Sequence, residues 1–307
     1  MSGVPQPIVH DMRRARRLEW LTLFWMTTVV VVMYFAMGSS QAMRTAFLED
    51  ALSMIPAVTF LIAARLEPRD PSEKYPFGFV RVNSLAFLAS AVVLTMMGAW
   101  LLLDGVMGLI MGEHPTIGPV SLFGETVWFG WMMIAALTYS VIPPMILGHL
   151  KKPVSHRLRD KVLHTDALMQ KADWLTGLAG IAGILGVGLG YWWADSAAAA
   201  VISWSILRDG LTNMRTASAE LLDGAPRELK GPAISEEARR LQKRLEKRWP
   251  DATIRLRESG RYIMASVEGV ADPGPLPPAR ELMGDDPAWR LGRISFVPPP
   301  NAPPDSD

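Results

Sequence analysis

SLAFLASAVVLTMMGAWLLLDGVMGLIM (residues 84–111) is an apolar run in which Asp104 is the one charged residue. A helix needs about 20 mostly apolar residues to cross the hydrocarbon core of a bilayer. This run exceeds that length. It therefore predicts a membrane-spanning helix, and with it an integral membrane protein.

Five further apolar runs lie on either side of this one, and they divide the chain into two parts. The six candidate spans are approximately 18–38, 46–65, 84–111, 122–148, 166–190 and 195–216. The last two spans are interrupted by charges, at Asp166, Lys171, Asp173, Arg208 and Asp209. The pattern predicts a short N-terminal segment (1–17) and a domain of six transmembrane helices (18–226).

The basic residues of the connections predict the orientation in the membrane. They gather in alternate connections, at Arg13, Arg14, Arg16 and Arg17, then Arg65, Arg69, Lys74 and Arg81, then Lys151, Lys152, Arg157, Arg159 and Lys161. The other connections contain Arg44 alone. Basic residues favour the cytoplasmic side, so we expect both termini in the cytoplasm.

The charged, proline-rich residues 227–300 predict a small cytoplasmic α+β domain. Ser235 is a suitable N-cap for a helix that ends before Pro250. The elements expected are a helix at 234–249, two strands within 253–270 around a turn at 258–260, a short helix near 278–289 and a strand at 293–298. This α-β-β-α-β order is that of a ferredoxin-like domain. Residues 301–307 are expected to be a disordered tail.

Composition excludes several classes of function. The chain has no cysteine, which rules out disulfides, thiolate metal sites and cysteine nucleophiles. Its net charge is +1, so nothing predicts a nucleic-acid partner. No serine, histidine and acid arrangement recurs across the spans, and we expect neither an enzyme nor a bound cofactor.

Ionisable groups inside a span are costly and mark candidate functional sites. Asp50 and Met54 stand four residues apart in the second span, and Met169 and Asp173 do so in the fifth. Each pair shares one helix face. The alternative is that Asp50 is hydrated at the interface, that Asp173 pairs with Lys171, and that both methionines fill apolar gaps.

Five stretches, in order, resemble the cation diffusion facilitators, a family of six-span exporters of divalent metal ions with a cytoplasmic domain. They are GSSQAMRTAFLEDALSM (38–54), EKYPFGFVRVNSLA (73–86), TDALMQKADWLTGLAG (165–180), WADSAAAAVISWSIL with AELLDGAP (193–226), and ESGRYIMASVEG (258–269). The resemblance implies a homodimer in a bacterial inner membrane that exchanges a metal cation for protons.

In that family a tetrahedral metal site lies between the second and fifth spans. The resemblance places its ligands at Asp50, Met54, Met169 and Asp173, so methionine replaces the usual Asp on one helix and the usual His on the other. Zinc prefers nitrogen, thiolate and carboxylate ligands, whereas a thioether suits copper(I). Zinc, another divalent ion and copper(I) all remain open as the transported ion.

Two further expectations follow from the resemblance. Arg81 and Asp223 match a pair that joins the third and sixth spans near the dimer interface in relatives. The two methionines also leave an alternative open: a non-transporting relative that acts as a dimer partner or sensor.

Overall fold

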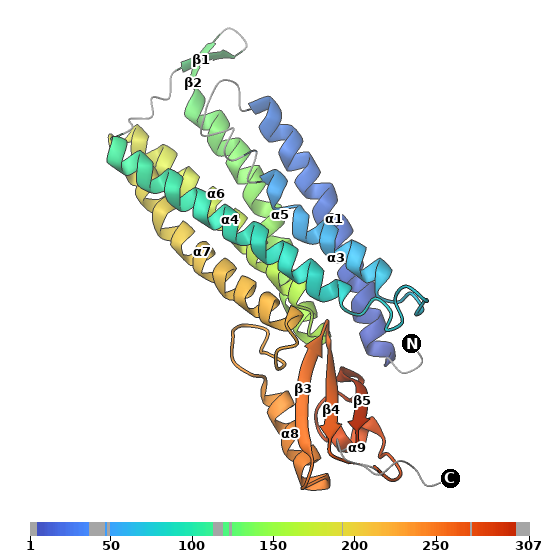
Figure 1. Cartoon of the computed structure of the whole chain (residues 1–307). Coiled ribbons are helices and arrows are strands. Elements are labelled where there is room, and N and C mark those ends of the chain that lie inside the picture. Colours follow the sequence, from blue (N-terminus) through green and yellow to red (C-terminus); the bar gives the residue numbers. More distant parts are fainter. Residues whose placement is uncertain are drawn as a thin grey trace.

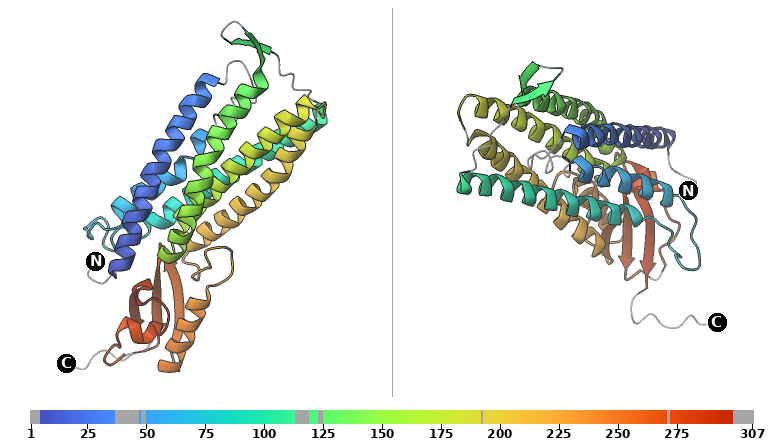
Figure 2. Two further views of the ribbon diagram at one scale, coloured as in Figure 1. Left: turned by 180° about the vertical axis from the view of Figure 1, so that it is seen from behind. Right: turned by 90° about the horizontal axis from the view of Figure 1, so that it is seen from above.

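A computed structural model describes residues 5–36, 47, 50–112, 119–122, 125–191, 193–270 and 272–298. A bundle of long helices is joined to a small C-terminal domain (Figure 1). The bundle comprises α1 (Gln6–Ala36), α3 (Ile55–Leu66), α4 (Val82–Met111), α5 (Phe129–Leu158), α6 (Lys161–Gly188) and α7 (Ala194–Leu221). The C-terminal domain lies at the end of the bundle where α1 and α4 begin and α7 ends, which we call the domain end (Figure 1; Figure 2, left).

Each helix of the bundle overlaps one of the predicted spans, although not all are long and apolar enough to cross a membrane. Among the described residues, three helical stretches meet both criteria, at Gln6–Tyr34, Val82–Met111 and Phe129–Leu158. The others are short, as α3 is, or interrupted by charged residues, as α6 and α7 are. The three apolar helices are those of a membrane protein.

Two predicted boundaries are wrong. The span expected at 46–65 contains a turn at Ser53 and Met54, and an unbroken helix begins at Ile55. Pro56 stands in the first turn of that helix, where the missing N–H costs no hydrogen bond. The span expected at 122–148 begins instead with an antiparallel strand pair, β1 (Pro119–Leu122) and β2 (Glu125–Trp128), at the end of the bundle remote from the C-terminal domain (Figure 1).

Small residues bring α4 and α7 into close contact along their length. A Cβ atom added at Gly98 would stand 2.6 Å from the backbone nitrogen of Leu207, and one at Gly210 would stand 2.7 Å from the Cα atom of Thr95. No side chain fits at such distances, so glycine is required at both positions. In a bilayer the hydrophobic effect does little to hold helices together, so the close backbone approach stabilises the α4–α7 pair through van der Waals contact.

The C-terminal domain follows the predicted order of elements. It comprises α8 (Glu236–Arg248), β3 (Thr253–Ser259), β4 (Tyr262–Glu268), α9 (Ala279–Met283), the 3₁₀ turn η1 (Ala288–Arg290) and β5 (Leu291–Val297). The sheet order is β3-β4-β5, with β4 antiparallel to β3 and parallel to β5. Helices α8 and α9 pack on the sheet through Leu241, Leu245, Ile263, Leu282 and Met283.

Local signals in this domain are mostly confirmed. Ser235 caps α8 by accepting a hydrogen bond from the backbone N–H of Ala238 at 3.2 Å. The hairpin turn differs from the prediction, because Ser259 pairs with Tyr262 and leaves Gly260 and Arg261 as the turn. Gly260 has φ +60°, a backbone conformation that glycine adopts without a steric penalty.

Candidate functional site

The first predicted pair lies directly before α3, and the turn at Ser53 and Met54 means that the two residues do not share one face of a continuous helix. Asp50 is in a short helical stretch that precedes the turn, and Met54 occupies the N-cap position of α3. Both residues are half-buried. Ser53 fixes the turn by donating its hydroxyl to the backbone oxygen of Asp50 at 2.9 Å.

The second predicted pair lies in the interior of α6. Met169 is completely buried and Asp173 is 8% exposed. Met169 packs in an apolar cluster with Leu94 and Met97 of α4 and with Ile206 of α7. A buried carboxylate one turn from a buried thioether is the arrangement expected on the inner face of a transport helix.

Helix α3, which follows the first pair, packs against α6, which carries the second pair. Within the described parts of the chain, no three Asp, Glu or His side chains are grouped closely enough to hold a metal ion. A site between these helices would therefore use the two carboxylates together with sulfur. Such a donor set carries two negative charges and accommodates soft as well as borderline ions.

Buried ion pairs join the domain end of the bundle to the C-terminal domain. Lys161, at the start of α6, lies 3.0 Å from Glu220 of α7 and also contacts Glu258 of β3 at 2.5 Å. All three side chains are at most 5% exposed. The hydroxyl of Ser84 in α4 donates to Glu220 at 2.5 Å and accepts from the backbone N–H of Gly260 at 3.0 Å. The backbone N–H of Gly260 thus ties the hairpin turn to α4.

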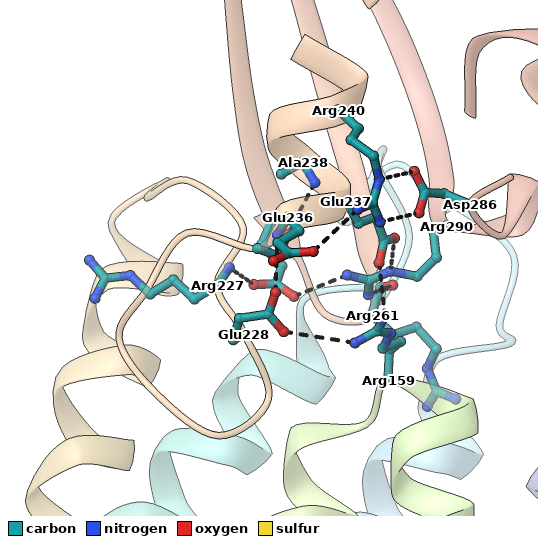
Figure 3. Close-up of polar contacts among 12 residues, drawn as sticks. Arg159, Arg227, Glu228, Glu236, Glu237, Ala238, Arg240, Arg261, Asp286 and Arg290 are labelled. Atoms are coloured by element: carbon teal, nitrogen blue, oxygen red, sulfur yellow. Dashed lines mark hydrogen bonds and ion pairs between the residues drawn. The ribbon is translucent and has the colours of Figure 1, made fainter. Parts of the chain in front are cut away.

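A second group of ion pairs continues this contact into the C-terminal domain (Figure 3). The guanidinium of Arg290 lies 2.8 Å from the buried carboxylate of Glu237 and donates to the backbone oxygen of Arg261. Arg159, in the α5–α6 connection, reaches Glu237 at 3.5 Å and Glu228 at 3.9 Å. Because Arg159 lies directly before α6, a movement of α6 would displace these ion pairs with the C-terminal domain.

Arg81 and Asp223 form the ion pair that the sequence predicts. Asp223 is also bonded by Arg257 of β3, whose Nη1 lies 2.6 Å from the carboxylate, a partner that sequence reasoning missed. The hydrogen bond from Arg257, together with the charges of both guanidinium groups, lowers the pKa of Asp223. The Arg81–Asp223 pair joins the start of α4 to the end of α7. Arg257 connects this pair to strand β3 of the C-terminal sheet.

A family model for the cation efflux transmembrane domain matches residues 20–222 of the chain. The chain belongs to the cation efflux family, the cation diffusion facilitators. The match extends from the middle of α1 to the end of α7 and contains both pairs of candidate site residues. The family resemblance and the metal-cation class of transporter are thereby confirmed.

Relatives in bacteria are similar to the chain at low identity. A probable cation efflux system protein of Mycobacterium tuberculosis, MT2084, is 25% identical over 253 residues, which cover 82% of this chain and 71% of the relative. The manganese efflux system protein MneS of Bacillus subtilis is 22% identical, covering 60% of each chain. The zinc transporter ZitB of Pectobacterium atrosepticum is 23% identical, covering 62% of this chain and 54% of the relative.

Proposed function

We propose that the protein exports a metal cation across the bacterial inner membrane in exchange for protons, through a site formed by Asp50, Met54, Met169 and Asp173. The observation that carries the proposal is the packing of α3 against α6, because Asp50 and Met54 directly precede α3 whereas Met169 and Asp173 lie within α6. Each pair supplies one carboxylate, and carboxylates provide all of the formal negative charge that would attract a cation.

The domain end of the bundle is, in this proposal, the cytoplasmic side. The basic residues of three connections gather there, as the positive-inside rule requires. Both termini would then be cytoplasmic, and the functional unit would be a homodimer. Alternating access would come from movement of α3 and α6 relative to the rest of the bundle.

The ion is best described as a divalent metal of borderline softness. Relatives are named for manganese and for zinc efflux, which supports a divalent ion. The two thioethers replace harder ligands and weaken the preference for zinc, because zinc favours nitrogen, thiolate and carboxylate donors. The thioethers also extend the range of metal ions that the site could bind toward soft ions such as copper(I).

A second function is favoured by the surroundings of Met169. Its side chain is completely buried among apolar residues of α4 and α7, which is also how a methionine that only fills space would lie. A relative that has lost its metal and acts as a dimer partner or sensor would show this arrangement.

Metal uptake into proteoliposomes distinguishes the two functions. The purified protein is reconstituted, and uptake of zinc, manganese, iron(II), cobalt and copper(I) is followed with protein-free liposomes as the control. An exporter moves at least one of these ions and releases protons in the opposite direction. Absence of uptake for all five ions would reject the transporter in favour of the dimer partner.

A further inference from the structure

A buried charged cluster lies where α1, α5 and α6 meet. The ammonium group of Lys151 in α5 lies 2.8 Å from the carboxylate of Glu19 in α1, and it also contacts the carboxylate of Asp166 in α6. All three side chains are completely buried. Because they come from three helices, they form a single site only in the folded bundle.

The cluster contains one more negative charge than positive charge. Two carboxylates face one ammonium group, and an unbalanced charge in a site without water is strongly disfavoured. One oxygen of each carboxylate, Oε1 of Glu19 and Oδ1 of Asp166, is buried and has no hydrogen-bond partner among the described residues. A single proton on either of these two oxygens would leave one carboxylate facing one ammonium group. The resulting hydroxyl could donate a hydrogen bond to the other oxygen.

Neighbouring charges do not supply the missing positive charge. Arg16 of α1 donates instead to the backbone oxygen of Ala64 in α3. The ring of His164 in α6 packs against that of His156. Lys161, at the start of α6, pairs with Glu220 and Glu258. Arg17, Lys152 and Lys171 are exposed.

A row of buried polar side chains leads from the cluster along α6 to the proposed transport site. Asp166, Gln170 and Asp173 follow at intervals of four and three residues, which places them on one face of the helix. The rise of the helix separates them by about 6 and 4.5 Å along its axis. Gln170 is completely buried, and neither atom of its amide is hydrogen-bonded within the described part of the chain.

Gly148 allows α5 to cover this row closely. A Cβ atom added there would stand 3.1 Å from the Cβ atom of Gln170. The amide can donate at one atom and accept at the other, so it can link a group on either side of it. Asp166, Gln170 and Asp173 therefore form a buried polar path along α6 from the cluster to Asp173.

We infer that Glu19, Lys151 and Asp166 form a proton-binding site that holds one proton shared between the two carboxylates. Proton binding forms an O–H bond at one carboxylate oxygen, and release of the proton to water or to the row along α6 breaks that bond. Proton binding is a property of the cluster by itself. Its part in exchange with the metal ion rests on the proposed function.

Infrared spectroscopy of the metal-free, full-length protein in lipid tests the site. The parent is expected to show a C=O band of a protonated carboxyl group at pH 7 that is absent from both Glu19→Gln and Asp166→Asn. Each variant retains Lys151 opposite one carboxylate, so the charge is balanced and the fold is kept. The matched control is Asp11→Asn, which removes a carboxylate of α1 that already has a single partner in α5, Arg157, at 2.7 Å.

The outcomes separate this inference from the proposed function. Loss of the band in both cluster variants but not in Asp11→Asn supports the site, whether or not the parent moves metal. An unchanged band in the two variants would overturn it, even if metal uptake and proton release are observed. In proteoliposomes, the variants should flatten the pH profile of metal uptake that the parent and Asp11→Asn share.

Discussion

The guanidinium of Arg261, in the β3–β4 turn, lies 2.8 Å from the carboxylate of Glu67 at the end of α3. The same Nη2 atom lies 2.9 Å from the carboxylate of Asp160, directly before α6. One residue of the C-terminal domain therefore joins the end of α3, the helix that follows Asp50 and Met54, to the start of α6, the helix that contains Met169 and Asp173. All three side chains are buried, and burial raises the pKa of Glu67 while the charge of Arg261 opposes that change.

Replacement of Arg261 by methionine should destabilise the protein severely. It would leave Glu67 and Asp160 buried without their cation, and breaking a buried pair in this way costs about 3–5 kcal/mol. Unfolding of the purified protein in detergent measures the loss. Arg255→Met is the control, because that arginine pairs with Glu268 while 70% exposed. Similar stability of the two variants would show that Arg261 does not hold the helices.

The coupling between Arg81 and Asp223 should be weak. Both side chains are about half exposed, and exposed pairs contribute at most about 1 kcal/mol. A double-mutant cycle with Arg81→Ala and Asp223→Ala isolates that energy. Exchange of the two charges should recover only part of the loss, since Arg257 would then face an arginine at position 223. Complete recovery would mean that Arg257 does not share Asp223.

Acid should remove the contribution of Asp286 to stability. Arg240 bonds this carboxylate at 2.6 Å, and the hydrogen bond lowers its pKa below the usual 3.8. A lowered pKa stabilises the folded protein above pH 3.8, and this effect is lost as the pH falls toward the folded-state value. Asp286→Asn should therefore lower the unfolding temperature at pH 7, and the difference from the parent should shrink as the pH falls below 3.8. Asp285→Asn, at an exposed neighbouring position, should leave the unfolding temperature unchanged.

Reporter fusions test the proposed orientation. A fusion after residue 115 and a fusion after residue 226 should report opposite sides of the membrane, with the second in the cytoplasm. The basis is the gathering of basic residues in alternate connections. The same side for both fusions would reject the six-span arrangement.

Helix positions could be read from the sequence because they depend on local composition. The apolar run at 84–111 corresponds to α4 at Val82–Met111, and the run at 195–216 to α7 at Ala194–Leu221. The strand pair β1–β2 was missed, because its short segments adjoin an apolar run and carry no separate signal.

Pairings between distant residues could not be read in the same way. Lys151 and Lys161 count as basic connection residues in the sequence, yet both are buried in ion pairs with partners far along the chain. Arg261 looks like an ordinary turn residue, and only the packing of the turn into the bundle shows its role. The Arg81–Asp223 pair was found in advance because the family resemblance supplied it.

Metal uptake by Asp173→Asn in proteoliposomes tests the central proposal, that the carboxylates between α3 and α6 bind the transported ion. Asp104→Asn is the matched control, because that carboxylate lies on the exposed face of α4. Uptake should be lost in Asp173→Asn and in Asp50→Asn but kept in Asp104→Asn, and Met54→Asp with Met169→His should increase zinc uptake. Undiminished uptake in Asp173→Asn and Asp50→Asn would contradict the account.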